Sequence, residues 1–393
     1  MKLDLSQLPV VDVHCHPYTR KEALTADEFT NVTAFGGGSA QYLAEAGLPV
    51  DAAALSRLQR SKHDTVYFRN MLHRLAELFD CEAEVEQVVA NRNRAIAAEG
   101  YAGYNTRLLQ SAGVTTLVMD FGYPVPNIPV AQFRAETGVE IAPIYRIEVL
   151  IAELLKLAIG WSECRRRFDD TLSAALAQQG FRGLTSIIAY RTGLDISPLS
   201  RNPDQGMQAW EAIQRGTGGG AMKKLRDYFF CRSLELCMEH AVPMQVHAGM
   251  GDWQVQLTAC RPALLMDLLR FPTFRGCRVL LVHTGYPYHA EAGYMANVLP
   301  NLWLDLSEGI PFAGQAARRI LSEVLEMAPL SRVCYGSDAF GSPEPFQVSA
   351  QLGKRAVAQV LESLVDDGML SPSEAQAAAY QILSQTAREL FGL

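Results

Sequence analysis

The chain has 393 residues, of which 49% are hydrophobic and 20% charged, and its formal net charge is −7 at pH 7. These values are typical of a globular protein and exclude a disordered chain, collagen and a coiled coil. Lys and Arg residues are scattered and form no basic stripe. We therefore expect no nucleic-acid or anionic-membrane partner and favour a small-molecule ligand.

The N-terminal residues contain no apolar stretch of signal-peptide length, and no apolar run approaches the roughly 18 residues of a membrane-spanning helix. The eight cysteines are widely spaced and include no C-x-x-C pair, which favours free, buried thiols over disulfides. We therefore expect a cytoplasmic protein. A homo-oligomer stays open, because oligomers are common among enzymes of this size.

Short runs rich in β-branched residues predict strands along the chain. In order they are 9–13, 114–120, 140–146, 183–189, 242–247, 278–283, 302–306 and 332–337. Segments with helical periodicity lie between most of them, at 148–179, 222–240, 262–269, 314–327 and 346–366. This alternation is typical of parallel βαβ units, and eight such units predict one α/β domain over residues 1–393, a closed (β/α)8 TIM-like barrel.

The longest interruption of this pattern lies between the first and second strands, from about 19 to 110. The apolar spacing from Val66 to Phe79 predicts amphipathic helices within it, and the run Gly36–Gly38 predicts a loop. We expect this helical insertion to cap the mouth of the barrel. The last segment, 372–393, is expected to form a helix packed on the outside.

Two histidines, His14 and His16, end the first predicted strand. Residues two apart on a strand face the same way, so both imidazoles can reach one metal ion. Taken alone, the pair is equally compatible with two unrelated polar residues.

Three further strands deliver residues of the same chemistry. His247 ends the fifth strand, His283 ends the sixth and Asp338 follows the eighth. All would lie at the C-terminal rim, where barrel enzymes carry their active sites. Three imidazoles and a carboxylate suit zinc, and also Mn, Fe and Ni. An ion held there would activate water, with Asp338 as both ligand and proton acceptor.

Charged and aromatic residues follow neighbouring strands at the same rim. Arg191, with Tyr190 beside it, follows the fourth strand and can hold a substrate carboxylate in a bidentate fork. Arg146 and Glu148 follow the third strand, where substrate binding and a local ion pair that shapes the loop are equally compatible with the sequence. Further rim candidates are Asp120, Trp253, Tyr286 and Glu308.

These motifs resemble the amidohydrolase superfamily, and within it the amidohydrolase-2 branch. The resemblance rests on V-D-x-H-x-H at the first strand, the single His after the fifth, L-V-H-T-G-Y-P after the sixth and G-S-D after the eighth. Two other segments, G-L-T-S-I-I-A-Y-R-T-G-L and I-Y-R-I-E, resemble the FluG-like group, whose members are often fused to glutamine-synthetase domains. The resemblance covers nearly the whole chain.

By position, the resemblance implies His14, His16, His247 and Asp338 as metal ligands. In two-metal members of the superfamily the strand-six His binds the second ion, and a lysine carbamate or a glutamate at strand four bridges the two ions. This chain has Thr185 at strand four, which can do neither. We therefore expect one divalent ion, zinc before Mn, Fe or Ni, with His283 as an electrophile or hydrogen-bond donor toward the substrate.

The function that the resemblance implies is metal-dependent hydrolysis of the C–N bond of an amide by metal-activated water, with Asp338 passing the proton to the departing amine. The link to glutamine-synthetase domains suggests a small carboxylate-bearing substrate such as a γ-glutamyl amide, held by Arg191. One alternative is a metal-dependent decarboxylase or a uronate-isomerase-like enzyme, which would use the same ligands. The other is a non-catalytic binding barrel that has lost its bridging residue at Thr185.

Overall fold

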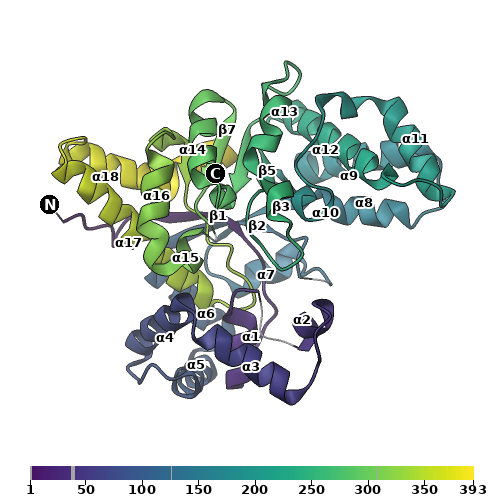
Figure 1. The fold of residues 1–393 in the computed structure, drawn as a ribbon. Coiled ribbons are helices and arrows are strands. Elements are labelled where there is room, and N and C mark those ends of the chain that lie inside the picture. The colour runs from purple at the N-terminus through teal and green to yellow at the C-terminus, as the bar shows by residue number, and fades with distance from the viewer. Residues whose placement is uncertain (1, 37–39, 125, 308) are drawn as a thin grey trace.

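The computed structural model describes residues 2–36, 40–124, 126–307 and 309–393. Gly37 and Gly38 of the predicted loop, and Glu308 of the predicted rim, fall outside these ranges. Within them, eight parallel strands form one sheet in the order of the chain (Figure 1). The strands are β1 (Val10–Cys15), β2 (Val114–Asp120), β3 (Glu140–Arg146), β4 (Leu184–Ser186), β5 (Met244–His247), β6 (Val279–Val282), β7 (Leu302–Asp305) and β8 (Val333–Cys334).

The sheet closes on itself through the backbone next to β1. Val13 N donates to Tyr335 O at 3.1 Å, and Asp338 N donates to His14 O at 2.8 Å. These bonds join β1 to the segment that follows β8, so the strands form a (β/α)8 barrel. The predicted fold class is confirmed.

Helices follow the strands around the barrel. Those outside the insertion are α7 (Val130–Glu136), α8 (Ile147–Leu155), α9 (Trp161–Gln178), α10 (Ile188–Arg191), α11 (Pro203–Gln214), α12 (Ala221–Glu239), α13 (Met266–Arg270), α14 (His289–Val298), α15 (Gly309–Ala313), α16 (Ala317–Leu325), α17 (Glu344–Asp366), α18 (Pro372–Tyr380) and α19 (Thr386–Phe391). The predicted helix 148–179 is two helices, since Gly160 caps the start of α9 and glycine disfavours a helix interior. In the described part of the chain, no helix has the length and apolar character needed to cross a membrane.

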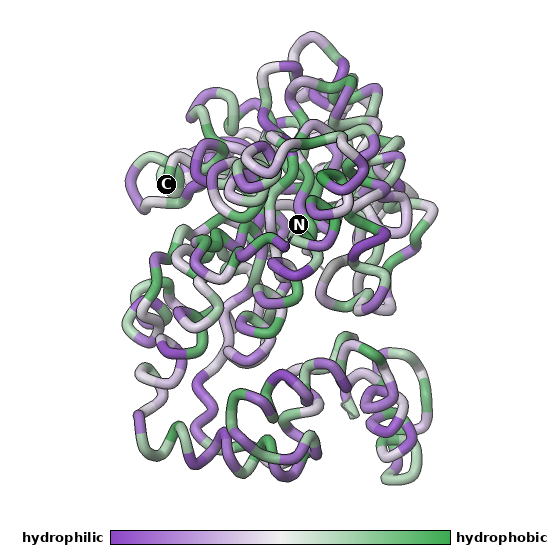
Figure 2. The backbone as a smooth tube through the Cα atoms, turned by 90° about the vertical axis from the view of Figure 1, so that its left-hand side faces the viewer, coloured by the Kyte–Doolittle hydropathy of each residue, from purple (hydrophilic) through white to green (hydrophobic). Residues whose placement is uncertain are grey.

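The segment between β1 and β2 is helical, and its helices gather at one side of the barrel (Figures 1 and 2). They are α1 (Ala26–Thr33), α2 (Ala40–Glu45), α3 (Ala52–His63), α4 (Val66–Phe79), α5 (Val85–Glu99) and α6 (Tyr101–Ser111). In α4, the Thr65 side chain accepts from Phe68 N and so caps the helix start. Phe68, Met71, Leu72 and Leu75 then recur at helical spacing and form a buried stripe. This stripe packs with residues of α17 in a core of its own.

A register shift in β1 aims both histidines of the H-x-H motif. Val11 and Val13 belong to the cluster inside the barrel, whereas Cys15 packs in the outer layer under the helices. The pairing of β1 with β2 shifts between Asp12 and Cys15. Such a bulge reverses which residues face inward. It therefore lets the inward positions pass from Val13 to His14 and then to His16.

The predicted terminal helix 372–393 is two helices: α18 packs against α17 on the outside, as expected, whereas α19 closes one end of the barrel interior, which corrects the expectation for the last residues. Ala387, Leu390 and Phe391 share a buried cluster with Val118 of β2 and Leu280 of β6. These strands are not neighbours in the sheet, so such residues meet only in the barrel interior. The apolar face of α19 has a better burial site there than on a solvated flank.

A Leu390→Ala variant should therefore lose about 2–5 kcal/mol of unfolding free energy, the range for a truncated core leucine. Leu390 is only 2% exposed, whereas Leu199 is 65% exposed and serves as the control. Leu199→Ala should change stability by about 0.5 kcal/mol or less. Urea denaturation of both variants measures the difference. Equal stabilities would contradict the position of α19.

Candidate metal centre

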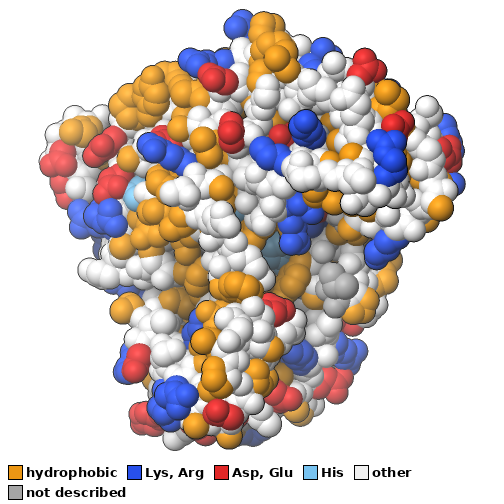
Figure 3. Space-filling model, turned by 45° about the vertical axis from the view of Figure 1, so that its right-hand side comes forward, with side chains coloured by type: hydrophobic (Ala, Val, Ile, Leu, Met, Phe, Trp, Pro, Cys, Tyr) orange, Lys and Arg blue, Asp and Glu red, His pale blue; other side chains and the backbone are white. Residues whose placement is uncertain are grey.

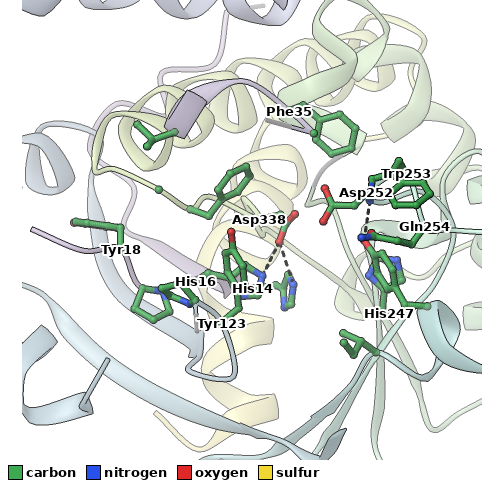
Figure 4. A pocket seen from close by; sticks show the side chains of 18 of the residues that line it. His14, His16, Tyr18, Phe35, Tyr123, His247, Asp252, Trp253, Gln254 and Asp338 are labelled. Atoms are coloured by element: carbon green, nitrogen blue, oxygen red, sulfur yellow. Dashed lines mark hydrogen bonds and ion pairs between the residues drawn. The ribbon is translucent and has the colours of Figure 1, made fainter. Parts of the chain in front are cut away.

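Three of the predicted ligands converge at the C-terminal end of the barrel. His14 Nε2 and His16 Nε2 each lie 3.2 Å from Asp338 Oδ1. One ligand atom from each of the three residues lies within 4.8 Å of the others (Figure 4). All three side chains are buried. This is the size and donor composition of a divalent metal site.

The backbone beside the centre is held by the aspartate of the V-D-x-H-x-H motif. Asp12 accepts from Ser337 N at 2.9 Å and from Ser337 Oγ at 2.5 Å. Burial raises the pKa of Asp12 to about 7, against the hydrogen bonds from Ser337, which lower it. Asp338 itself has a left-handed backbone with φ 53°, a conformation that aspartate tolerates better than most residues. Asp12, a residue of β1, thus fixes the position of Asp338 through its hydrogen bonds with the neighbouring Ser337.

In His14 and His16, the ring nitrogen that faces away from Asp338, Nδ1, carries the ring proton. His14 Nδ1 lies 2.8 Å from Gln245 Oε1. Gln245 Nε2 donates to Val13 O at 2.6 Å, which turns Oε1 toward the ring. His16 Nδ1 lies 3.3 Å from the backbone oxygen of Asp120. Each ring therefore donates through Nδ1 and directs Nε2 at Asp338, as metal-binding histidines do.

This donor set fits a cation. Two imidazole Nε2 atoms and a carboxylate oxygen face one another, so a positive charge between them is required. Burial lowers the pKa of His14, but the hydrogen bond and charge of Asp338 outweigh it and raise the pKa to about 9. Burial likewise raises the pKa of Asp338, yet hydrogen bonds from His14 and His16 bring it well below its usual range. The carboxylate is therefore ionised, and the centre attracts either protons or a metal ion.

His247 and His283 lie beside this cluster and contact each other. His283 Nε2 is 3.0 Å from His247 Nδ1, and the His283 ring centroid is 5.3 Å from that of His14. Burial lowers the pKa of His247 to about 3 and that of His283 well below its usual value. His247 Nε2 is buried and has no hydrogen-bond partner within the described ranges. The fourth predicted ligand thus lies outside the three-residue cluster and has a ring nitrogen available.

Arg146 and Glu148 do not form the local ion pair that was one interpretation of the sequence. Arg146 Nε and Nη2 both bind Asp120 Oδ2, at 2.8 and 2.5 Å. Glu148 Oε1 instead accepts from Ser186 Oγ at 2.5 Å. Arg146 lines the pocket above the metal centre, and Glu148 does not. Burial raises the pKa of Glu148.

A pocket of about 550 Å³ opens onto the candidate centre. Figure 3 shows this face hollowed between the barrel and the insertion. Arg191 lines the pocket and has no ion-pair partner in the described structure. The ring centroids of Tyr190 and His247 lie 4.5 Å apart. The Tyr190 hydroxyl accepts a hydrogen bond from Asp252 N at 2.9 Å. Trp253, 47% exposed, stands at the mouth.

Of the remaining rim candidates, Asp120 is buried and bound to Arg146, and Tyr286 stacks on His289 with ring centroids 5.5 Å apart. Four residues beside the centre were not predicted from the sequence: Asp12, Gln245, Asp305 and Ser307. They form hydrogen bonds with the histidines or with the residue that precedes Asp338. Only Asp12 carried a signal, as part of V-D-x-H-x-H. Gly336 of G-S-D has a packing reason: a Cβ there would lie 3.1 Å from Ser307 Cβ and 3.2 Å from Asp305 Oδ2.

A parallel barrel with two histidines at the end of β1 and an aspartate after β8 defines a metal-dependent enzyme of the amidohydrolase fold. A family model described as amidohydrolase, of the amidohydrolase-2 branch, matches residues 162–393. This chain belongs to that family, as predicted.

The comparisons with individual proteins agree. Protein fluG of Emericella nidulans is 27% identical over an alignment of 362 residues, and the match covers 84% of this chain but only 41% of that protein. A protein from Lactobacillus casei assigned as a metal-dependent hydrolase superposes with a TM-score of 0.83 at 26% identity, over 100% of this chain and 98% of the other. A glucuronate isomerase from Caulobacter crescentus shares the fold, with a TM-score of 0.64 at 15% identity over 98% and 92% of the chains.

Proposed function

We propose that this protein is a metal-dependent amidohydrolase that cleaves the C–N bond of a small carboxylate-bearing amide, with a γ-glutamyl amide as the first candidate. The observation that carries the proposal is the convergence of His14 Nε2 and His16 Nε2 on Asp338 Oδ1. With His247 as a fourth ligand, these residues would hold one divalent ion, zinc before Mn, Fe or Ni. Such an ion polarises the scissile carbonyl and activates water.

Asp338 would handle the proton of the reaction. Its carboxylate is buried, ionised and within hydrogen-bond reach of both histidines. It would accept a proton from the attacking water and deliver it to the departing amine nitrogen. The left-handed backbone at Asp338 and the bonds between Ser337 and Asp12 keep the carboxylate in place during the transfer.

The pocket supports a substrate that carries both charges of an amino acid. Arg191, which has no ion-pair partner among the described residues, offers a guanidinium for a carboxylate, with Tyr190 and Arg146 beside it on the lining. Asp252, joined to Tyr190 through its backbone, and Glu45 line the same pocket and suit an ammonium group. A γ-glutamyl group carries an α-carboxylate and an α-ammonium on one carbon, which fits this arrangement. Similarity to fluG supports the same choice by analogy alone.

The insertion, residues 19–110, is proposed to cap the pocket as part of a single unit spanning 1–393. Phe35, Tyr42 and Glu45 from the insertion line the pocket together with the barrel residues. A cytoplasmic setting is proposed as well, since all eight cysteines are free thiols in the structure.

Two measurements test the proposed function. Elemental mass spectrometry on protein purified without chelators should find about one equivalent of divalent metal. Product mass then separates the reactions, because hydrolysis adds water, decarboxylation removes carbon dioxide and isomerisation leaves the mass unchanged. Release of carbon dioxide from an aromatic acid, with γ-glutamyl amides left intact, would replace the hydrolase by the decarboxylase. Protein that takes up no metal from zinc or manganese would favour a non-catalytic barrel.

Replacing Arg191 by glutamine should raise KM for a carboxylate-bearing amide by about 10- to 100-fold, since a charge-assisted hydrogen bond contributes about 1.5–3 kcal/mol. The kcat should change little if Arg191 binds the substrate away from the scissile bond. Arg201→Gln is the control, because Arg201 pairs with Glu235 outside the pocket. Steady-state kinetics on the acid and on its neutral carboxamide analogue separate charge recognition from misfolding. An equal rise in KM for both substrates would contradict the assigned role.

A further inference from the structure

A chain of hydrogen bonds runs from the end of β7 to His247. Ser307 Oγ lies 2.6 Å from Asp305 Oδ1 and 2.8 Å from His283 Nδ1. His283 Nε2 in turn lies 3.0 Å from His247 Nδ1. All four side chains are buried, so these contacts are shielded from exchange with water.

The direction of the first two bonds follows from the donors present. Asp305 Oδ1 also receives the backbone N–H groups of His283, at 2.8 Å, and of Ser307, at 2.9 Å. This oxygen is therefore an acceptor, and the hydroxyl hydrogen of Ser307 points to it. A serine hydroxyl has one hydrogen, so Ser307 Oγ must accept from His283. The ring proton of His283 accordingly lies on Nδ1.

The position of the proton on His283 then determines the position of the proton on His247. A neutral imidazole that donates through Nδ1 has a lone pair on Nε2. His283 Nε2 can therefore accept from His247 Nδ1–H, which leaves the lone pair of His247 on Nε2. That atom is the buried one without a partner among the described residues, and His247 lines the pocket. The chain thus ends in an electron-pair donor on a ring that lines the pocket.

We infer that Ser307 and Asp305 are positioning residues that set the tautomers of His283 and His247, so that Nε2 of each ring is unprotonated. This inference rests on the proposed function, because the tautomer of His247 matters for a metal ion only if His247 is a ligand. The inference also changes the role expected for His283 from the sequence. A ring held in this tautomer accepts a hydrogen bond or a proton through Nε2 and does not donate one.

The tautomers are measured on the metal-free protein labelled with ¹⁵N in its histidines. Long-range ¹H–¹⁵N correlation spectra should show both rings protonated on Nδ1, with assignments from His283→Gln and His247→Gln. Ser307→Ala removes the acceptor and should shift His283, and with it His247, toward the Nε2–H form. Ser307→Thr keeps a hydroxyl and should preserve the native pattern. Ser349→Ala is the matched control, because Ser349 is equally buried and its hydroxyl has no partner in the described structure.

Metal affinity gives a second readout, by competition for Zn²⁺ with a chromophoric chelator. Ser307→Ala should weaken zinc binding by about 10- to 100-fold, the usual effect of removing a group that orients a ligand. Ser307→Thr and Ser349→Ala should stay within about threefold of the parent.

A parent spectrum with the proton of His247 on Nε2 would overturn the inference, as would a Ser307→Ala protein with unchanged tautomers and zinc affinity. If Ser307→Ala does not fold, the parent spectrum alone decides the matter. Failure of the substrate screen is a separate result, since the tautomers are read without metal or substrate.

Discussion

An Asp338→Asn variant should keep its fold and lose about 10³-fold or more in kcat, the effect of removing a proton-transfer group. The amide oxygen can still face His14 and His16, but it carries no charge and cannot take a proton. Asparagine tolerates the left-handed backbone that Asp338 adopts, with φ 53°, so the loop should not rearrange. Zinc affinity should fall together with kcat, since the carboxylate is a proposed ligand. Activity at saturating metal and a thermal melt of the same preparation measure both effects.

Asp80→Asn is the matched control for this substitution. Asp80 also has a left-handed backbone, with φ 51°, but it caps the end of α4 in the insertion. The same change of charge and of backbone preference there should leave kcat and zinc affinity unaltered. An Asp338→Asn enzyme that retains a tenth or more of its activity would show that the proton acceptor is another group, and His283 would be the next candidate.

Strands were predicted best where both faces of the strand are buried, because the apolar pattern of the sequence then has only one interpretation. β2 and β3 have the predicted bounds, because each is an uninterrupted, mostly buried run between helices. β6 ends one residue early, since Asp305 holds the His283 backbone in a turn with φ 66°. That bond comes from another strand, so no local pattern predicts it. The register shift in β1 and the burial of α19 in the barrel also depend on tertiary packing.

The candidate site was predictable where the residue type itself carries the chemistry. His14, His16 and Asp338 stand at strand ends that the barrel brings together, and the structure places them in one cluster. The partner of Arg146 was not predictable, because Asp120 is a neighbour only through the pairing of β2 with β3. Ser307 is a common residue type in a loop, so its bonds become visible only in three dimensions.

Replacing Arg92 by methionine should lower the unfolding free energy by about 3–5 kcal/mol, the effect of breaking a buried ion pair from one side. Arg92 Nε lies 2.7 Å from Glu344 Oε1, and both side chains are completely buried. Arg92 belongs to α5 of the insertion, and Glu344 begins α17, the helix that follows Asp338. Without the guanidinium, the Glu344 carboxylate would keep, among the residues that the structure describes, only the 2.8 Å hydrogen bond from Tyr104.

A double-mutant cycle in urea, with Glu344→Leu as the second change, separates the ion pair from packing. The double variant should be more stable than Arg92→Met, because it removes the buried charge together with its partner. Arg166→Met is the surface control, since Arg166 and Asp170 are more than half exposed, and it should cost less than about 1 kcal/mol. Equal losses for Arg92→Met and the double variant would mean that Arg92 acts through its other bonds, to Lys21 O and Asn93 Oδ1. A positive coupling would instead show that charge pairing joins the insertion to the helix next to the metal centre. Removal of this ion pair should then also lower the affinity for zinc.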